Sequence, residues 1–109
     1  MVITTAPSRE LAEKLAEGIL SRKLAACVQM MAIRSFYIWD GELQKEEEVA
    51  LHIKTTEARY SELEAHILEH HPYDVPEIIK VPITGGLPAY LDWVDFATGN
   101  DSKEMGRKD

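Results

Sequence analysis

The hydrophobic residues of this chain follow two spacings along the sequence, a period of two typical of strands and a period of three to four typical of helices. Leu11, Leu15 and Ile19 recur every four residues beside charged neighbours, which predicts an amphipathic helix. The two spacings together predict these elements in chain order: a strand over 1–5, a helix over 8–23, strands over 25–39 and 46–55, a helix over 57–71, a strand over 77–84, and a helix over 88–97.

Residues that cap and break helices delimit these elements. Ser8 is placed to cap the first helix, and Thr55-Thr56 to cap the second. Pro72 ends the second helix and Pro88 opens the third. Asp40-Gly41 between two strand patterns predicts a tight hairpin.

Folding the chain at this hairpin predicts how its two strands pair. Three apolar residues of the first strand then face three of the second: Ala32 and Val49, Met30 and Leu51, Val28 and Ile53. The element order is strand–helix–strand–strand–helix–strand, followed by a C-terminal helix. With two right-handed crossovers, this order predicts an α+β fold, a ferredoxin-like βαββαβ sandwich with an extended β-hairpin.

The strand over 25–39 is too long for the predicted domain. At about 3.3 Å per residue it would span roughly 50 Å, whereas a domain of this size has a radius of gyration near ~13 Å. Its outer part, residues 36–39, is apolar on both faces. The strand could bend back over its own core. We favour an arm that projects from the domain and mediates self-association through Phe36, Tyr37, Ile38 and Trp39.

The amino-acid composition limits the domain organisation and excludes several classes of protein. The chain has 109 residues, of which 45% are hydrophobic, so one domain over 1–99 and a polar tail over 100–109 are expected. The net charge of −7 argues against nucleic-acid binding and against an anionic membrane surface. The single cysteine, Cys27, excludes an internal disulfide, and no apolar run approaches the roughly 20 residues of a membrane span. A cytoplasmic location is expected.

Five segments resemble, in order, the signatures of the CutA divalent-cation tolerance proteins. They are 23–28 (KLAACV), 37–41 (YIWDG), 54–56 (KTT), 71–78 (HPYDVPEI) and 90–93 (YLDW). The resemblance runs from about residue 2 to residue 96. It implies a ferredoxin-like protomer in a homotrimer, whose long hairpins extend the sheets of the neighbours. It also implies a role in divalent metal tolerance, copper binding, and no catalytic activity.

The resemblance further implies a copper site at the adjacent pair His70 and His71. A single ion held by both would require the helix to end there, because neighbouring helical residues project about 100° apart. Thr4 stands where some members carry a cysteine, so a soft ligand is missing. We therefore expect modest binding of copper(II) or another divalent cation, with no cofactor required for folding.

The histidine spacing itself leaves two interpretations open. His66 and His70 lie four residues apart and share a helix face, which suits a divalent ion such as copper, nickel or zinc. Alternatively, this face is a solvated polar surface near a helix C-terminus. His71 falls within the apolar stripe of the helix, where a half-buried histidine with satisfied hydrogen bonds is the commoner case.

Aromatic residues and one carboxylate in the signature segments suggest a ligand cleft between subunits. They are Tyr37, Trp39, Tyr73, Glu77 and Trp93. Plain interface packing is the alternative for this set. A ligand at such a cleft would make the protein a trimeric sensor of the PII type, although the long loop of that family is replaced here by the Asp40-Gly41 hairpin.

No enzymatic activity is expected. The chain shows no spacing typical of a Ser-His-Asp triad or a metal hydrolase. An acylphosphatase would need a phosphate-binding loop after the first strand, but residues 5–9 contain no glycine, and Pro7 removes a backbone donor. The partners expected are therefore further copies of this chain and divalent metal ions.

Overall fold

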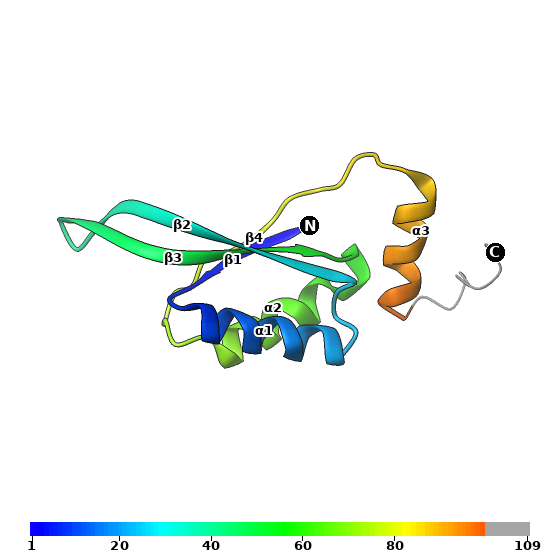
Figure 1. Ribbon diagram of the computed structural model, residues 1–109, viewed down its shortest axis with the longest axis horizontal. Coiled ribbons are helices and arrows are strands. Elements are labelled where there is room, and N and C mark those ends of the chain that lie inside the picture. Colours follow the sequence, from blue (N-terminus) through cyan, green and yellow to red (C-terminus); the bar gives the residue numbers. More distant parts are fainter. Residues whose placement is uncertain (100–109) are drawn as a thin grey trace.

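The computed structural model describes residues 1–99 (Figure 1). The predicted tail over 100–109 lies outside the described residues. The elements, in chain order, are β1 (Val2–Ala6), α1 (Arg9–Ser21), β2 (Cys27–Trp39), β3 (Glu42–Lys54), the 3₁₀ helix η1 (Glu57–Arg59), α2 (Tyr60–His70), β4 (Ile78–Lys80) and α3 (Pro88–Ala97).

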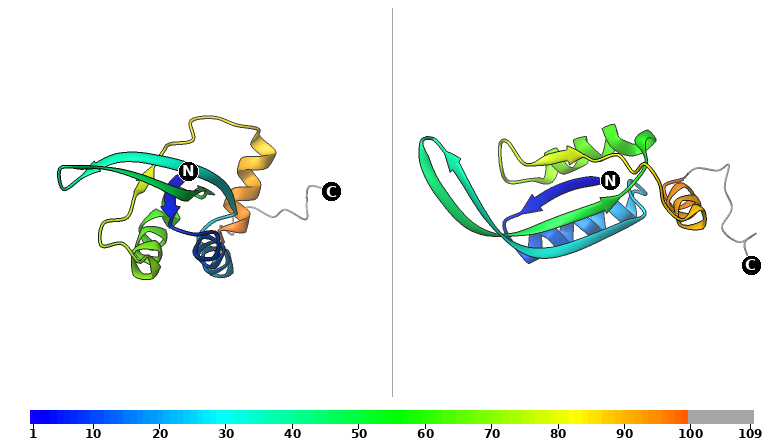
Figure 2. Two further views of the ribbon diagram at one scale, coloured as in Figure 1. Left: turned by 60° about the vertical axis from the view of Figure 1, so that its left-hand side comes forward. Right: turned by 90° about the horizontal axis from the view of Figure 1, so that it is seen from above.

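The four strands form one antiparallel sheet in the order β2-β3-β1-β4. Both α1 and α2 cover the same face of this sheet (Figures 1 and 2). This arrangement confirms the ferredoxin-like fold. The predicted hairpin register is confirmed as well, since β2 pairs with β3 through Val28–Ile53, Met30–Leu51 and Ala32–Val49.

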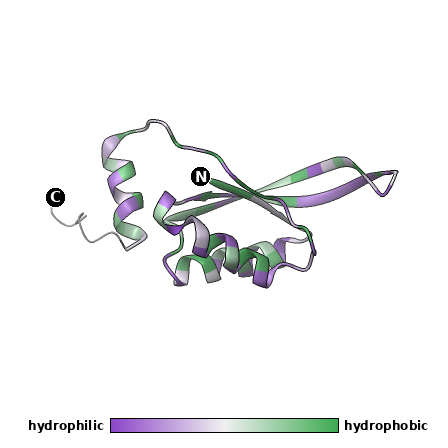
Figure 3. Cartoon of the chain, turned by 180° about the vertical axis from the view of Figure 1, so that it is seen from behind, coloured by the Kyte–Doolittle hydropathy of each residue, from purple (hydrophilic) through white to green (hydrophobic). Residues whose placement is uncertain are grey.

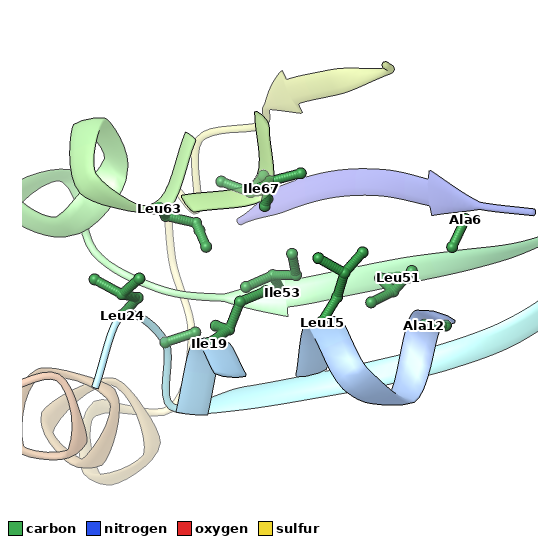
Figure 4. Packing of buried hydrophobic residues seen from close by; sticks show 11 residues of the cluster. Ala6, Ala12, Leu15, Ile19, Leu24, Leu51, Ile53, Leu63 and Ile67 are labelled. Carbon is green, nitrogen blue, oxygen red and sulfur yellow. The ribbon is translucent and has the colours of Figure 1, made fainter. Parts of the chain in front are cut away.

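The core lies between the two helices and the sheet, and it draws on every one of these layers (Figure 4). Burying these side chains removes apolar surface from water, which is the main favourable term in folding. The fully buried side chains of the core include Ile19 from α1, Leu51 and Ile53 from β3, and Leu63 and Ile67 from α2.

One of the two predicted helix caps is confirmed. The Ser8 hydroxyl accepts a hydrogen bond from the Leu11 N–H at 3.2 Å and so caps α1. At Thr55-Thr56 the prediction holds for position alone, because Thr56 is the N-cap residue of η1 but its side chain makes no capping hydrogen bond. The Thr55 hydroxyl instead donates to the Leu24 carbonyl at 2.6 Å, and the chain passes through η1 before α2 begins.

The last strand is shorter than the predicted 77–84. Pairing with β1 covers Ile78–Lys80, and beyond it the Val81 N–H donates to the Met1 carbonyl at 2.7 Å. Pro82 then has no N–H to donate. The chain from 81 to 87 continues without secondary structure and leaves Val81, Ile83 and Leu87 exposed.

The outer half of the β2–β3 hairpin forms an arm, which we define as residues 33–48. The arm projects beyond the two helices and gives the molecule dimensions of 54 × 25 × 21 Å (Figures 1 and 2). At its end Asp40 and Gly41 adopt positive φ angles of 56° and 79°, as a tight hairpin requires. The alternative of a strand folded back over its own core is therefore wrong.

Hydrophobic and hydrophilic residues are interspersed along the arm (Figure 3), and several of the large apolar ones are exposed. The exposed fraction is 60% for Phe36, 65% for Ile38, 60% for Trp39 and 56% for Leu43. A cluster of this kind on a folded chain marks an interaction surface.

The third helix lies at the end of the molecule opposite to the arm (Figure 1). Arg59 ties it to the start of α2, because its Nε donates to the Thr98 carbonyl at 2.8 Å while its Nη1 pairs with Glu62 at 2.8 Å. No helix within residues 1–99 is long and apolar enough to cross a membrane.

Candidate functional site

Two of the three candidate metal ligands stack on α2. The rings of His66 and His70 lie one turn apart, with their centroids 4.3 Å from each other. The Nδ1 of His70 lies 2.8 Å from the His66 carbonyl oxygen. A carbonyl only accepts hydrogen bonds, so His70 carries its proton on Nδ1 and keeps the lone pair on Nε2.

His66 itself is buried against α1. A Cβ atom at Gly18 would lie only 3.1 Å from its Nε2, so α1 passes close to the ring at this point. Burial lowers the pKa of His66, and the nearby His70 and Arg22 lower it further, with Glu69 opposing them. Its Nδ1 is buried and has no hydrogen-bond partner. His66 is thus a neutral, enclosed ring rather than an open ligand.

His71 follows the end of α2 and turns into the body of the protein. Its Nδ1 accepts a hydrogen bond from the Tyr73 N–H at 3.1 Å, so the proton is on Nε2, which lies 2.7 Å from the Thr5 carbonyl. Both ring nitrogens are therefore used within the chain. The imidazole joins the end of α2 to β1 and offers no lone pair to a metal.

The predicted histidine set therefore does not fit a metal as a unit. Nowhere in the part of the chain that the structure describes do three His, Cys, Asp or Glu side chains gather as metal ligands. At the position where the resemblance implies a thiol, Thr4 has a buried hydroxyl with no hydrogen-bond partner. Of the three histidines, only His70 is exposed, and its Nε2 is the ring nitrogen that can reach an ion in solvent; the unpartnered Nδ1 of His66 is buried.

Four of the five predicted cleft residues lie together, unlike the three histidines. Tyr37, Trp39, Tyr73 and Glu77 line one open groove of about 760 Å³ between the arm and the segment 73–77. The fifth, Trp93, does not line this groove. It lies on α3 with its ring 5.6 Å from that of Tyr90.

Carboxylates dominate the electrostatics of the groove. The Tyr37 hydroxyl donates to Glu46 Oε1 at 2.6 Å, and this hydrogen bond raises the pKa of Tyr37 to about 12. The pKa of Tyr73 is also raised, by burial first and then by Glu48 and Glu46. Both phenols therefore stay protonated in a field that opposes added negative charge.

Several lining residues were not assigned to the cleft from the sequence. They include Thr5, Ser35, Glu46, Glu48, Asp74 and Val75. For Glu46 the hairpin register could have indicated its place. Pairing the two strands outward from the Asp40-Gly41 turn sets Glu46 opposite Ser35, two residues from Tyr37. The approach of segment 73–77 to the arm has no comparable local signal.

The family and its solved structures agree with this fold. A family profile described as CutA1 divalent ion tolerance protein matches residues 1–97. The chain is 45% identical over 101 residues to "Protein CutA, chloroplastic" of Arabidopsis thaliana, in a match that covers 92% of this chain but 56% of that relative. This chain thus spans little more than half of the plant protein.

Two solved structures superimpose closely. The divalent cation tolerance protein of Thermus thermophilus has a TM-score of 0.87 at 39% identity, covering 90% of this chain and 96% of that one. The periplasmic divalent cation tolerance protein CutA of Archaeoglobus fulgidus has a TM-score of 0.87 at 38% identity, covering 89% and 95%. These relatives are named as tolerance proteins, and no enzyme family is indicated. The chain belongs to the CutA1 divalent ion tolerance family.

Proposed function

We propose that this protein is a homotrimeric divalent-cation tolerance protein whose copies associate through their arms. The apolar arm is the observation that carries the proposal. Its exposed side chains lie on both faces of the hairpin, since Phe36 and Ile38 alternate with Tyr37 and Trp39 along β2. Nothing in residues 1–99 covers the outer end of the arm, and a second copy is the partner whose surface is always available to it.

The edges of the sheet support assembly between copies. Strand β2 is one edge, so its outer N–H and C=O groups have no neighbouring strand in the protomer. The segment 81–87 beyond the other edge is extended and exposes Val81 and Ile83. An arm from one copy can therefore extend the sheet of another by main-chain pairing.

Ile38→Asp tests this assembly. We expect light scattering to report a trimer for the original chain and a smaller species for the variant, because a carboxylate would be buried in the interface. Leu68→Asp is the matched control, since Leu68 is 53% exposed on α2. A monomeric original chain at micromolar concentration, or equal effects of both variants, would contradict the proposal.

Divalent-ion tolerance includes, in this proposal, modest and reversible binding of copper(II). The free Nε2 of His70 is the donor that the hydrogen bonding of the three histidines supports. Calorimetric titration should show His70→Ala weakening copper(II) binding, whereas His71→Ala should leave it unchanged. Equal losses of copper(II) affinity in both variants would contradict a site at His70 alone and support the His70–His71 site implied by the family resemblance.

A second candidate function is favoured by the groove. A cavity of about 760 Å³ is in the size range of small-molecule sites, so the protein would act as a trimeric sensor of a small ligand. A thermal-shift screen of metals and small metabolites separates this function from a purely structural trimer. Stabilisation by a metabolite supports the sensor, and a screen without any shift excludes it.

A further inference from the structure

The wall of the groove has an unusual composition for an open surface. Twelve residues line it, and Lys, Arg and His are absent among them. They include four carboxylates, on Glu46, Glu48, Asp74 and Glu77, and three aromatic rings on the groove face, those of Tyr37, Trp39 and Tyr73. Phe36 also borders the groove, but strand alternation puts its ring on the opposite face of β2, where the Arg34 guanidinium carbon lies 5.9 Å from its centre. An uncompensated set of acids around a concave surface attracts cations and repels anions.

The negative charge comes from both sides of the groove. Glu46 and Glu48 project from β3 and are half-buried, whereas Glu47 between them is exposed on the opposite face and stands across from Arg34. Asp74 and Glu77 belong to the segment that forms the other wall. A ligand between the walls would therefore meet carboxylates from two directions.

The aromatic rings add a second attraction for cations. The face of an aromatic ring is electronegative, so an ammonium or guanidinium group within about 6 Å of its centre is stabilised. The chain already uses this contact elsewhere, with Lys80 Nζ lying 4.8 Å from the centre of the Tyr60 ring. In the groove, Tyr37, Trp39 and Tyr73 have no such cation from their own lining.

The combination favours an organic cation over a metal ion. A divalent metal needs several oxygens within about 2.6 Å, and within residues 1–99 no three acidic side chains are close enough together to provide them. An organic cation needs only a negative, ring-lined space. Its apolar substituents would also bury surface against the rings.

We propose that this groove binds a small organic cation carrying an ammonium or guanidinium group, held by Tyr37, Trp39 and Tyr73 and by the carboxylates Glu48 and Glu77. The inference rests on the sensor function proposed above and gives that function its ligand class. It applies to a free small molecule rather than to a lysine or arginine of another protein.

Tetramethylammonium is the probe, and the two tryptophans give an internal control. Trp39 lines the groove and Trp93 does not, so their indole N–H signals report on the groove and on α3 separately. In a nuclear magnetic resonance titration of the full chain, we expect tetramethylammonium to shift the Trp39 signal saturably and to leave Trp93 unmoved. Neutral tert-butanol of similar shape, and sodium chloride at equal ionic strength, should shift neither signal.

Substitutions in the groove and on the opposite face of β3 test where tetramethylammonium binds. Tyr73→Leu removes one ring and Glu48→Gln one charge, and each should weaken binding about two- to fivefold. Glu47→Gln removes the same charge from the other face of β3 and should leave the affinity unchanged. Equal losses from Glu47→Gln and Glu48→Gln would contradict the site, as would equal binding of tert-butanol.

The outcomes separate this inference from the functions proposed before it. A neutral or anionic metabolite that stabilises the protein, while tetramethylammonium leaves Trp39 unmoved, would overturn the ligand class and keep the sensor function. Saturable binding to a monomeric chain would support the groove and contradict the trimer.

Discussion

The two halves of the β2–β3 hairpin share one register and one alternation of side chains, yet they meet different surroundings. In the inner half Leu51 is fully buried beneath α1 and α2, whereas in the outer half Leu43 is 56% exposed. The two leucines lie eight residues apart on one strand and so project from the same face. The covered half is part of the body of the protein, and the uncovered half is the arm.

This difference shows what a hydrophobic alternation does and does not encode. The pattern specifies which face of a strand must leave water, but it does not specify what covers that face. For the inner half the cover is the pair of helices from the same chain (Figure 4). For the arm our proposal assigns the cover to other copies, so its stabilisation should depend on protein concentration.

Leu51→Ala should have the largest effect, because it leaves a cavity in the core. We expect the free energy of unfolding to fall by about 2–5 kcal/mol. Leu43→Ala removes the same atoms from the arm and should change the stability of the isolated chain by less than about 0.5 kcal/mol. Denaturant titration at several protein concentrations measures both effects.

The concentration series decides whether the comparison holds. The loss from Leu51→Ala should be present at every concentration, whereas any loss from Leu43→Ala should grow where the protein assembles. Equal, concentration-independent losses would mean that the arm is covered by its own chain.

His71→Ala should have the next largest effect, because the ring is the satisfied, buried histidine that the apolar stripe favoured rather than the metal ligand that the family resemblance implied. The change deletes the hydrogen bonds to Thr5 and Tyr73 and leaves a buried space, so about 2–4 kcal/mol of stability should be lost without any metal present. His70→Ala, at an exposed position on the last turn of α2, is the control and should cost less than about 0.5 kcal/mol. Similar thermal midpoints for the two variants would contradict the structural role of His71.

The fold was predictable because its signals are local or repeat along the chain. The Asp40-Gly41 turn determined the hairpin register, and the alternation on β3 then determined which face is buried. Thr56 stands at the N-cap of η1 without a side-chain cap, and the Thr55 hydroxyl donates instead to a partner distant in sequence, the Leu24 carbonyl. Long-range hydrogen bonds of this kind leave no periodic trace in a sequence.

The candidate site was less predictable for the same reason. The role of His71 depends on a contact with Thr5, 66 residues away, and the groove depends on the approach of segment 73–77 to the arm. The sequence identified four of the groove residues through the family resemblance, but Trp93 lies elsewhere on α3. Composition alone did not place Glu46 and Glu48 on the groove face and Glu47 on the other.

The buried ring of His66 gives the body a pH dependence. Its pKa is lowered in the folded protein, so the unfolded chain binds more protons at mildly acidic pH. The stabilisation from the neutral ring is complete above the unfolded value of about 6.5 and is lost as the pH falls towards the folded value. Denaturant titrations of the original chain and of His66→Gln should diverge least below pH 6 and most above pH 7. A pH-independent difference would contradict a neutral, enclosed His66.

The smallest expected effect lies on the arm and concerns the Tyr37–Glu46 hydrogen bond. Because the pKa of Tyr37 is raised to about 12, its contribution is present below the unfolded value of about 10 and is lost as the pH rises through 12. The pKa values of Tyr60 and Tyr73 are raised as well, so ultraviolet titration of phenolate should show several delayed transitions, of which the one near pH 12 is absent in Tyr37→Phe. Glu46→Gln should return that transition towards the unfolded value, whereas Glu47→Gln on the opposite face should leave it in place. If Glu46→Gln and Glu47→Gln move the Tyr37 transition equally, the raised pKa comes from the overall charge of the arm. The Tyr37–Glu46 hydrogen bond in the groove would then be contradicted.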